Sequence, residues 1–72
     1  MTATPPIDIL VNGAPRSVAP GATLLDVLRG LELDARTVVV EHNRHIVRRP
    51  ALAAVTLAAG DVIELVHFVG GG

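Results

Sequence analysis

The chain has 72 residues, of which 50% are hydrophobic and 18% charged, with a net charge of −1 and no cysteine. This length predicts one small domain, which buries only about 60% of the surface of its unfolded chain. The lack of cysteine excludes a disulfide, an iron–sulfur cluster and a thiolate zinc site. A single aromatic residue, Phe68, and the near-zero charge argue against nucleic-acid binding.

All six basic residues are arginine, which excludes enzymes that use a lysine nucleophile or Schiff base. It also leaves no lysine that could accept an isopeptide bond. The N-terminus lacks a basic segment followed by a long apolar run, as a secretory signal would have. No stretch approaches the roughly 18 apolar residues of a membrane span. We therefore expect a cytoplasmic protein without membrane association.

The first elements predicted in chain order form a β-hairpin. Residues 1–6 are expected to be a flexible tail. Residues 7–11 are rich in β-branched residues and partly alternate, as in a strand with one buried face. Asn12-Gly13 is a strong signal for a two-residue hairpin turn. Residues 14–18 would return, with Pro15 indicating an edge strand.

A helix is predicted next. Thr23 and Asp26 have the spacing of a capping box, in which each side chain accepts from the other residue's backbone N–H. The apolar residues of this segment recur at helical spacing and give one stripe: Leu24, Val27, Leu28 and Leu31. We predict a helix from Leu24 to about Leu31, which Gly30 weakens or ends.

Three more strands are predicted after the helix. The first covers residues 37–42 and is rich in β-branched residues. A turn at Asn43-Arg44 leads into a short strand over residues 45–48. Residues 51–54 are expected to form one helical turn. The last and longest strand covers residues 62–69.

The predicted fold is α+β, with a mixed sheet of four to five strands wrapped around one helix in the order β-β-α-β-β-β. The final strand would insert in the middle of the sheet. Residues 7–69 would form this domain and residues 70–72 a flexible glycine tail. The predicted core lies between helix and sheet and comprises Ile9, Val11, Leu24, Leu28, Leu31, Ile63 and Leu65.

Few side chains suggest catalysis. The three histidines could ligate zinc, but their spacing has no meaning outside a helix, so we interpret them as surface residues: His42, His45 and His67. Solvated strand faces and turns account for the carboxylates of Glu41, Asp61 and Glu64. The one serine, Ser17, lies in a predicted edge strand. We predict no catalytic residue, no metal site and no tightly bound cofactor.

The C-terminal residues are different. Three glycines follow an apolar strand and would form a thread that ends in a carboxylate at Gly72. Because glycine has no Cβ, Gly70 and Gly71 could be threaded into a narrow channel of a partner enzyme. Adenylation by ATP would activate the carboxylate, and a sulfur nucleophile would then leave a thiocarboxylate. Since the chain has no cysteine, we expect Gly72 to be the residue that is modified.

With these segments the chain resembles the ubiquitin-like β-grasp sulfur carriers, and among them most the thiamine-biosynthesis carriers of the ThiS type. The similar segments follow in order between Ile7 and Gly72: 9–13, 23–24, 27–28, 38–40 with Asn43, 46–47 with Arg49, 60–61 and 69–72. Three positions depart from the family's pattern. Glycine is frequent where Glu32 stands, a Val-Pro-Arg run is common where this chain has residues 47–49, and tryptophan is common near Leu52.

The resemblance implies a protein substrate and not an enzyme. An E1-like adenylating enzyme of the ThiF type would use ATP to activate Gly72. A sulfur donor such as a cysteine desulfurase would supply the sulfur, and a thiazole synthase of the ThiG type would accept it. Strand alternation places Leu10, Val66 and Phe68 on the face turned away from the helix, where we expect partners to dock. The resemblance adds Arg49 to these docking residues, although Arg48-Arg49 also suits a solvated turn.

Three other functions remain open at the level of sequence. A molybdopterin-synthase small subunit of the MoaD type would have the same fold and tail. A ubiquitin-like modifier would join Gly72 to a target lysine, and a structural interaction module would make no use of the glycines. The short length and the Val-Gly-Gly-Gly ending favour the thiamine carrier.

Overall fold

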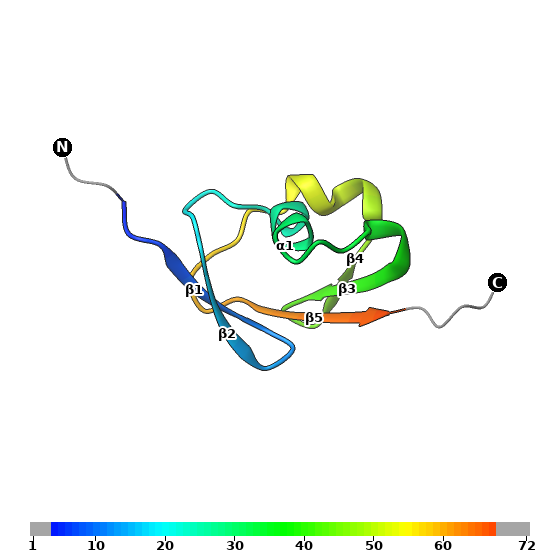
Figure 1. Cartoon of the computed structure of the whole chain (residues 1–72), viewed down its shortest axis with the longest axis horizontal. Helices are drawn as coiled ribbons and strands as arrows, with labels where there is room; N and C mark the ends of the chain where they lie inside the picture. The colour runs from blue at the N-terminus through cyan, green and yellow to red at the C-terminus, as the bar shows by residue number, and fades with distance from the viewer. Residues whose placement is uncertain (1–3, 68–72) are drawn as a thin grey trace.

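The computed structural model describes residues 4–67 and has the predicted order of elements (Figure 1). Residues 1–3 and 68–72 lie outside the described part. The elements are β1 (Ile7–Val11), β2 (Ala14–Val18), α1 (Leu24–Gly30), the 3₁₀ helix η1 (Ala35–Thr37), β3 (Val38–His42), β4 (His45–Val47), the 3₁₀ helix η2 (Arg49–Ala54) and β5 (Val62–His67).

The five strands form one mixed sheet in the order β2-β1-β5-β3-β4. Strand β5 lies in the middle, parallel to β1 and antiparallel to β3. The two antiparallel hairpins, β1–β2 and β3–β4, form the outer parts of the sheet. Helix α1 and η2 lie on the same side of the sheet (Figure 1). The predicted mixed sheet of four to five strands around one helix is confirmed, with five strands and with the last strand inserted centrally as predicted.

Helix α1 starts at the predicted capping box. The Asp26 N–H donates to Thr23 Oγ1 at 3.3 Å, and the Thr23 N–H donates to Asp26 Oδ2 at 2.9 Å. The helix ends at Gly30, one residue before the predicted end, and Leu31 is its C-cap. The next residue, Glu32, has a φ of 59°, in the left-handed region. That conformation gives a physical reason for the glycine that is frequent at this position in the family that the sequence resembles.

The buried core lies between the sheet and the helical side and comprises Ile9, Leu24, Val27, Leu28, Val38, Val40, Leu52, Leu57, Ile63 and Leu65. Five of the seven predicted core residues are in this set. The prediction was wrong for Val11 and Leu31, which are only half-buried and pack against its margin. Val11 is the last residue of β1, and Leu31 follows the end of α1, so each has fewer neighbours than a residue inside its element.

Two strand ends also differ from the prediction. Thr37 belongs to η1, because the Asp34 side chain caps this short turn by accepting from the Arg36 N–H at 2.9 Å. Arg48 lies outside β4 and is the N-cap of η2. That helix is six residues long, where one turn was predicted, and it buries Leu52. The predicted end of the last strand, at residues 68–69, lies outside the described residues.

The hairpin turn after β1 adds a side-chain connection to the central strand. Asn12 and Gly13 have φ values of 49° and 81°, as a two-residue turn of type I′ requires. The Leu65 N–H donates to Asn12 Oδ1 at 2.7 Å, and Asn12 Nδ2 donates to the Leu65 carbonyl at 3.2 Å. Strand β1 ends at Val11, so no further peptide group of β1 is available to bond Leu65 in the β1–β5 ladder. The Asn12 side chain takes the place of that peptide group.

Candidate functional site

One face of the sheet is left uncovered by α1 and η2, and we call it the outer face. It exposes four large apolar side chains: Leu10 (38%), Ile46 (68%), Val62 (38%) and Val66 (57%). The predicted exposure of Leu10 and Val66 is confirmed. Ile46 and Val62 were missed, although the same period-2 alternation of β4 and β5 would have placed them there.

The strand register brings these residues together. Leu10 of β1 lies opposite Val62 of β5. In the centre of the face, Glu41 of β3 lies opposite Glu64 of β5, and on its other side Glu41 lies opposite Ile46 of β4. The outer face therefore combines exposed apolar side chains with two glutamates that lie opposite one another on neighbouring strands.

The end of β5 leads toward the residues for which the sequence predicts chemistry. His67, the last described residue, pairs with Val38 in the β3–β5 ladder. Phe68, Gly70, Gly71 and Gly72 lie outside the described residues, so their docking and modification stay predictions. The described part supplies a central, hydrogen-bonded strand directly before them.

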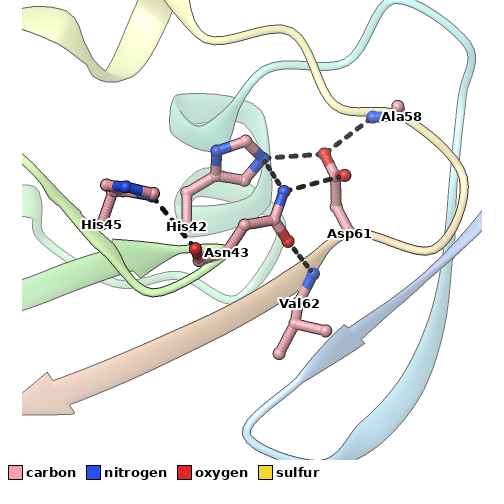
Figure 2. Close-up of polar contacts among 6 residues, drawn as sticks. All are labelled: His42, Asn43, His45, Ala58, Asp61 and Val62. Atoms are coloured by element: carbon pink, nitrogen blue, oxygen red, sulfur yellow. Dashed lines mark hydrogen bonds and ion pairs between the residues drawn. The ribbon is translucent and has the colours of Figure 1, made fainter.

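A second polar cluster joins the β3–β4 turn to the loop before β5 (Figure 2). His42 Nε2 lies 2.7 Å from Asp61 Oδ2 and, because an ionised carboxylate only accepts, acts as the donor. Asn43 Nδ2 donates to Asp61 Oδ1 at 3.2 Å, and the Val62 N–H donates to Asn43 Oδ1 at 2.9 Å. The Ala58 N–H donates to Asp61 Oδ2 at 2.9 Å.

The environment of Asp61 has opposing effects on its pKa. Burial of the carboxyl acts to raise the pKa, but hydrogen bonds from His42, the Ala58 N–H and Asn43 outweigh burial. The pKa of Asp61 is therefore lower than its usual value. The ionised carboxylate holds the loop and the turn together, which is more than the ordinary turn position that the sequence suggested.

The hydrogen bonds of this cluster join the β3–β4 turn to the loop before β5. His45 Nδ1 lies 3.1 Å from the Asn43 carbonyl. The Ser17 hydroxyl donates to Asp8 Oδ1 at 2.8 Å between the paired strands β2 and β1. Among residues 4–67 there is no group of three side chains placed to hold a metal ion. In the same described range, no helix has the length and apolar character needed to cross a membrane.

Arginines gather at the edge of the sheet next to β4. Arg36, Arg48 and Arg49 line a groove of about 460 Å³ together with apolar residues that include Val39 and Ile46. Arg36 is bound to Asp34, with Nη2 2.8 Å from Oδ2. Hydrogen bonds from the Arg36 side chain, and then from its backbone N–H, lower the pKa of Asp34 to about 2. Arg48 and Arg49 are exposed, and the predicted docking role of Arg49 stays a prediction.

Comparison with known proteins agrees with this geometry. The ThiS family model matches residues 9–72. The sulfur carrier protein ThiS of Bacillus subtilis is 44% identical over 50 residues, which are 69% of this chain and 76% of that protein. The crystal structure of the thiamine biosynthesis protein (ThiS) from Geobacter metallireducens superimposes with a TM-score of 0.78 at 35% identity. That alignment covers 92% of this chain and 100% of that one.

A longer relative contains a similar stretch. A thiazole synthase of Magnetococcus marinus is 44% identical over 64 residues, which are 89% of this chain but only 20% of that protein. The chain therefore spans about a fifth of the length of this relative.

Proposed function

This chain belongs to the ThiS family of sulfur carriers, and we propose that it supplies sulfur for the thiazole ring of thiamine as a thiocarboxylate on Gly72. The observation that supports this most is the extent of the family match, which runs through the glycine tail to Gly72. The domain before the tail supports it as well, because β5, the central strand, is the last element before the matched glycines in the sequence. In this function the chain is a protein substrate and not a catalyst.

The chemistry proceeds by activation and substitution. The Gly72 carboxylate attacks the α-phosphorus of ATP on an adenylating enzyme, and pyrophosphate leaves. A sulfur nucleophile at the oxidation level of sulfide then attacks the acyl carbon, AMP leaves, and a thiocarboxylate remains. If the nucleophile is a persulfide, the product is an acyl disulfide, which a thiol must cleave to release the thiocarboxylate and a disulfide.

Two partners follow from this scheme, an E1-like adenylating enzyme and a thiazole synthase. The thiazole synthase that contains a similar stretch supports the second. A carrier joined to its acceptor in one chain has a high effective concentration at the acceptor, which is useful only if the two react. Docking of the separate enzymes would use Leu10, Val66, Phe68 and Arg49.

The tail gives the sharpest test. Deleting Gly72 moves the carboxylate back by one residue, about 3.3–3.6 Å in an extended chain. A misplacement of 1 Å can cost on the order of 100-fold in rate, so ATP–pyrophosphate exchange with the adenylating enzyme should be lost. Gly71→Val should also fail, because its side chain would not fit a narrow channel. Deletion of Thr4, which is exposed and outside every element, is the matched control.

The readouts are pyrophosphate exchange, the intact mass after sulfur transfer, and the melting temperature. The parent and the Thr4 deletion should gain the oxygen-to-sulfur mass shift, and all variants should melt like the parent. The parent mass also tests whether Gly72 bears the free carboxylate. Normal exchange and sulfur gain by the Gly72 deletion would show that the proposal is wrong. A mass adduct of a second protein would instead indicate a modifier.

A further inference from the structure

The outer face combines an apolar surface with an unfavourable charge pair. Glu41 and Glu64 lie directly opposite one another on β3 and β5, where Cβ atoms are about 4.5–5.5 Å apart. Like charges in this arrangement destabilise a sheet. Val62 and Val66 are exposed on the same face, on both sides of Glu64 along β5, and Leu10 of β1 is exposed opposite Val62.

No cation of the described chain lies within 4 Å of these carboxylates. Within residues 4–67, the ion pairs closer than 4 Å are Asp34–Arg36 and His42–Asp61, and neither includes a glutamate. Arg48 lines the groove at the edge of this face but makes no such ion pair. By the general rule for opposed like charges, we expect the pair to destabilise the free domain, and a positive charge from another molecule would relieve this.

We propose that an arginine side chain of the adenylating enzyme lies between Glu41 and Glu64 when that enzyme docks on the outer face. This inference rests on the proposed function. A guanidinium presents five N–H donors in a planar fork, so it can donate to both carboxylates at once. It is also more weakly hydrated than an ammonium group, which suits a contact surrounded by Leu10, Val62 and Val66.

The choice of this partner follows from the joined relative. In the Magnetococcus marinus protein, the stretch similar to this chain is part of the thiazole synthase itself. A covalently joined synthase needs little affinity from a docking surface. The adenylating enzyme has to be recognised from solution, whether or not the synthase is joined. Complementary charges at the centre of an apolar surface supply that recognition.

The test uses charge-neutralising substitutions of equal size. Glu41→Gln, Glu64→Gln and the double variant are compared with the parent by calorimetric titration of the adenylating enzyme. Hydrogen bonds to charged groups are stronger than neutral ones, so the double variant should bind about 10- to 100-fold more weakly. Its affinity should also depend less on salt than that of the parent. Glu32→Gln is the matched control, since Glu32 is exposed beyond α1 and should bind like the parent.

Stability separates a binding role from a structural one. Removing one of two opposed like charges should raise the melting temperature of the free carrier at low salt, while affinity falls. Equal affinity of the double variant and the parent would overturn the arginine contact alone and leave the sulfur-carrier function intact. A lower melting temperature together with weaker binding would show that the glutamates support the fold. Heat from Mg²⁺ or Ca²⁺ binding to the parent, absent in the double variant, would identify a metal ion as the occupant instead. A parent that does not bind the enzyme at all would overturn both proposals.

Discussion

Replacing Asn12 should remove a connection between the two ends of the chain. The Asn12 carboxamide exchanges two hydrogen bonds with the backbone of Leu65, 53 residues away. Leu65 is 8% exposed, and its N–H and carbonyl point to where β1 has already ended. In Asn12→Gly the left-handed backbone at φ 49° is retained without strain, but both Leu65 groups lose their partner.

The expected loss of folding stability can be estimated from the N–H and the carbonyl group of Leu65. A buried polar group left without a partner costs about 1–3 kcal/mol. Water can reach the vacated position, because Asn12 itself is exposed, so each group should cost about 1–1.5 kcal/mol, at the low end of that range, and the two together about 2–3 kcal/mol. A domain of 72 residues has a total stability of roughly 4–11 kcal/mol. The substitution should therefore remove a large fraction of the free energy of unfolding.

Urea denaturation followed by far-ultraviolet circular dichroism measures this change, since the chain has no tryptophan or tyrosine for fluorescence. With an m value near 1 kcal/mol/M, the midpoint should fall by about 2–3 M. Asn12→Ala should destabilise further if the left-handed backbone is strained by a Cβ, which costs about 1–2 kcal/mol. Hydrogen exchange gives a local readout, because the Leu65 amide should lose protection first.

Two results would refute this reasoning. One is a urea midpoint for Asn12→Gly that equals that of the parent. The other is a Leu65 amide that exchanges as slowly in the variant as in the parent at equal global stability. Either result would mean that water or a rearranged turn replaces the carboxamide without cost.

Three further changes test the core, a turn and the polar cluster. Leu28 is 1% exposed, so Leu28→Ala should lower the free energy of unfolding by about 2–5 kcal/mol, and an unchanged urea midpoint would show that its side chain is not packed in the core. Glu32→Gly should raise the free energy of unfolding by about 0.5 kcal/mol. Relief of the left-handed strain at φ 59° stabilises the folded state by more than the added chain entropy stabilises the unfolded state, and a lower urea midpoint would contradict this. The pKa of Asp61 is lowered by folding, so its contribution is complete above the unfolded pKa of about 3.9 and is lost as the pH falls through the folded pKa. Asp61→Asn should therefore lose less stability than the parent between neutral pH and about pH 3, and equal losses would exclude Asp61 from the acid response.

Much of the fold was predictable because it depends on local patterns. The capping box at Thr23 and Asp26 and the Asn12-Gly13 turn are short-range signals, and both occur as predicted. The partial burial of Leu31 could not be predicted from such local patterns. Helical spacing places it on the apolar stripe, but the helix ends at Gly30, and the chain turns at Glu32 in a left-handed conformation.

In the candidate site, too, local patterns predicted some features and long-range pairing determined the others. Alternation within single strands predicted that Leu10 and Val66 would be exposed on the outer face, and both are. The opposition of Glu41 and Glu64 depends on the register between β3 and β5, which pairs residues 23 positions apart in the sequence. No local pattern in either strand specifies that register. The bond between His42 and Asp61 depends on the same long-range pairing.

The central position of β5 has a mechanical consequence. Force applied to the segment that follows β5 acts along a strand with parallel β1 on one side and antiparallel β3 on the other (Figure 1). Such a load shears both ladders together, so their hydrogen bonds must break nearly at once. Force on the edge strands β2 or β4 would instead peel their ladders one bond at a time. An unfolding motor or an optical trap that grips the domain after His67 should therefore meet higher resistance than one that pulls on either hairpin.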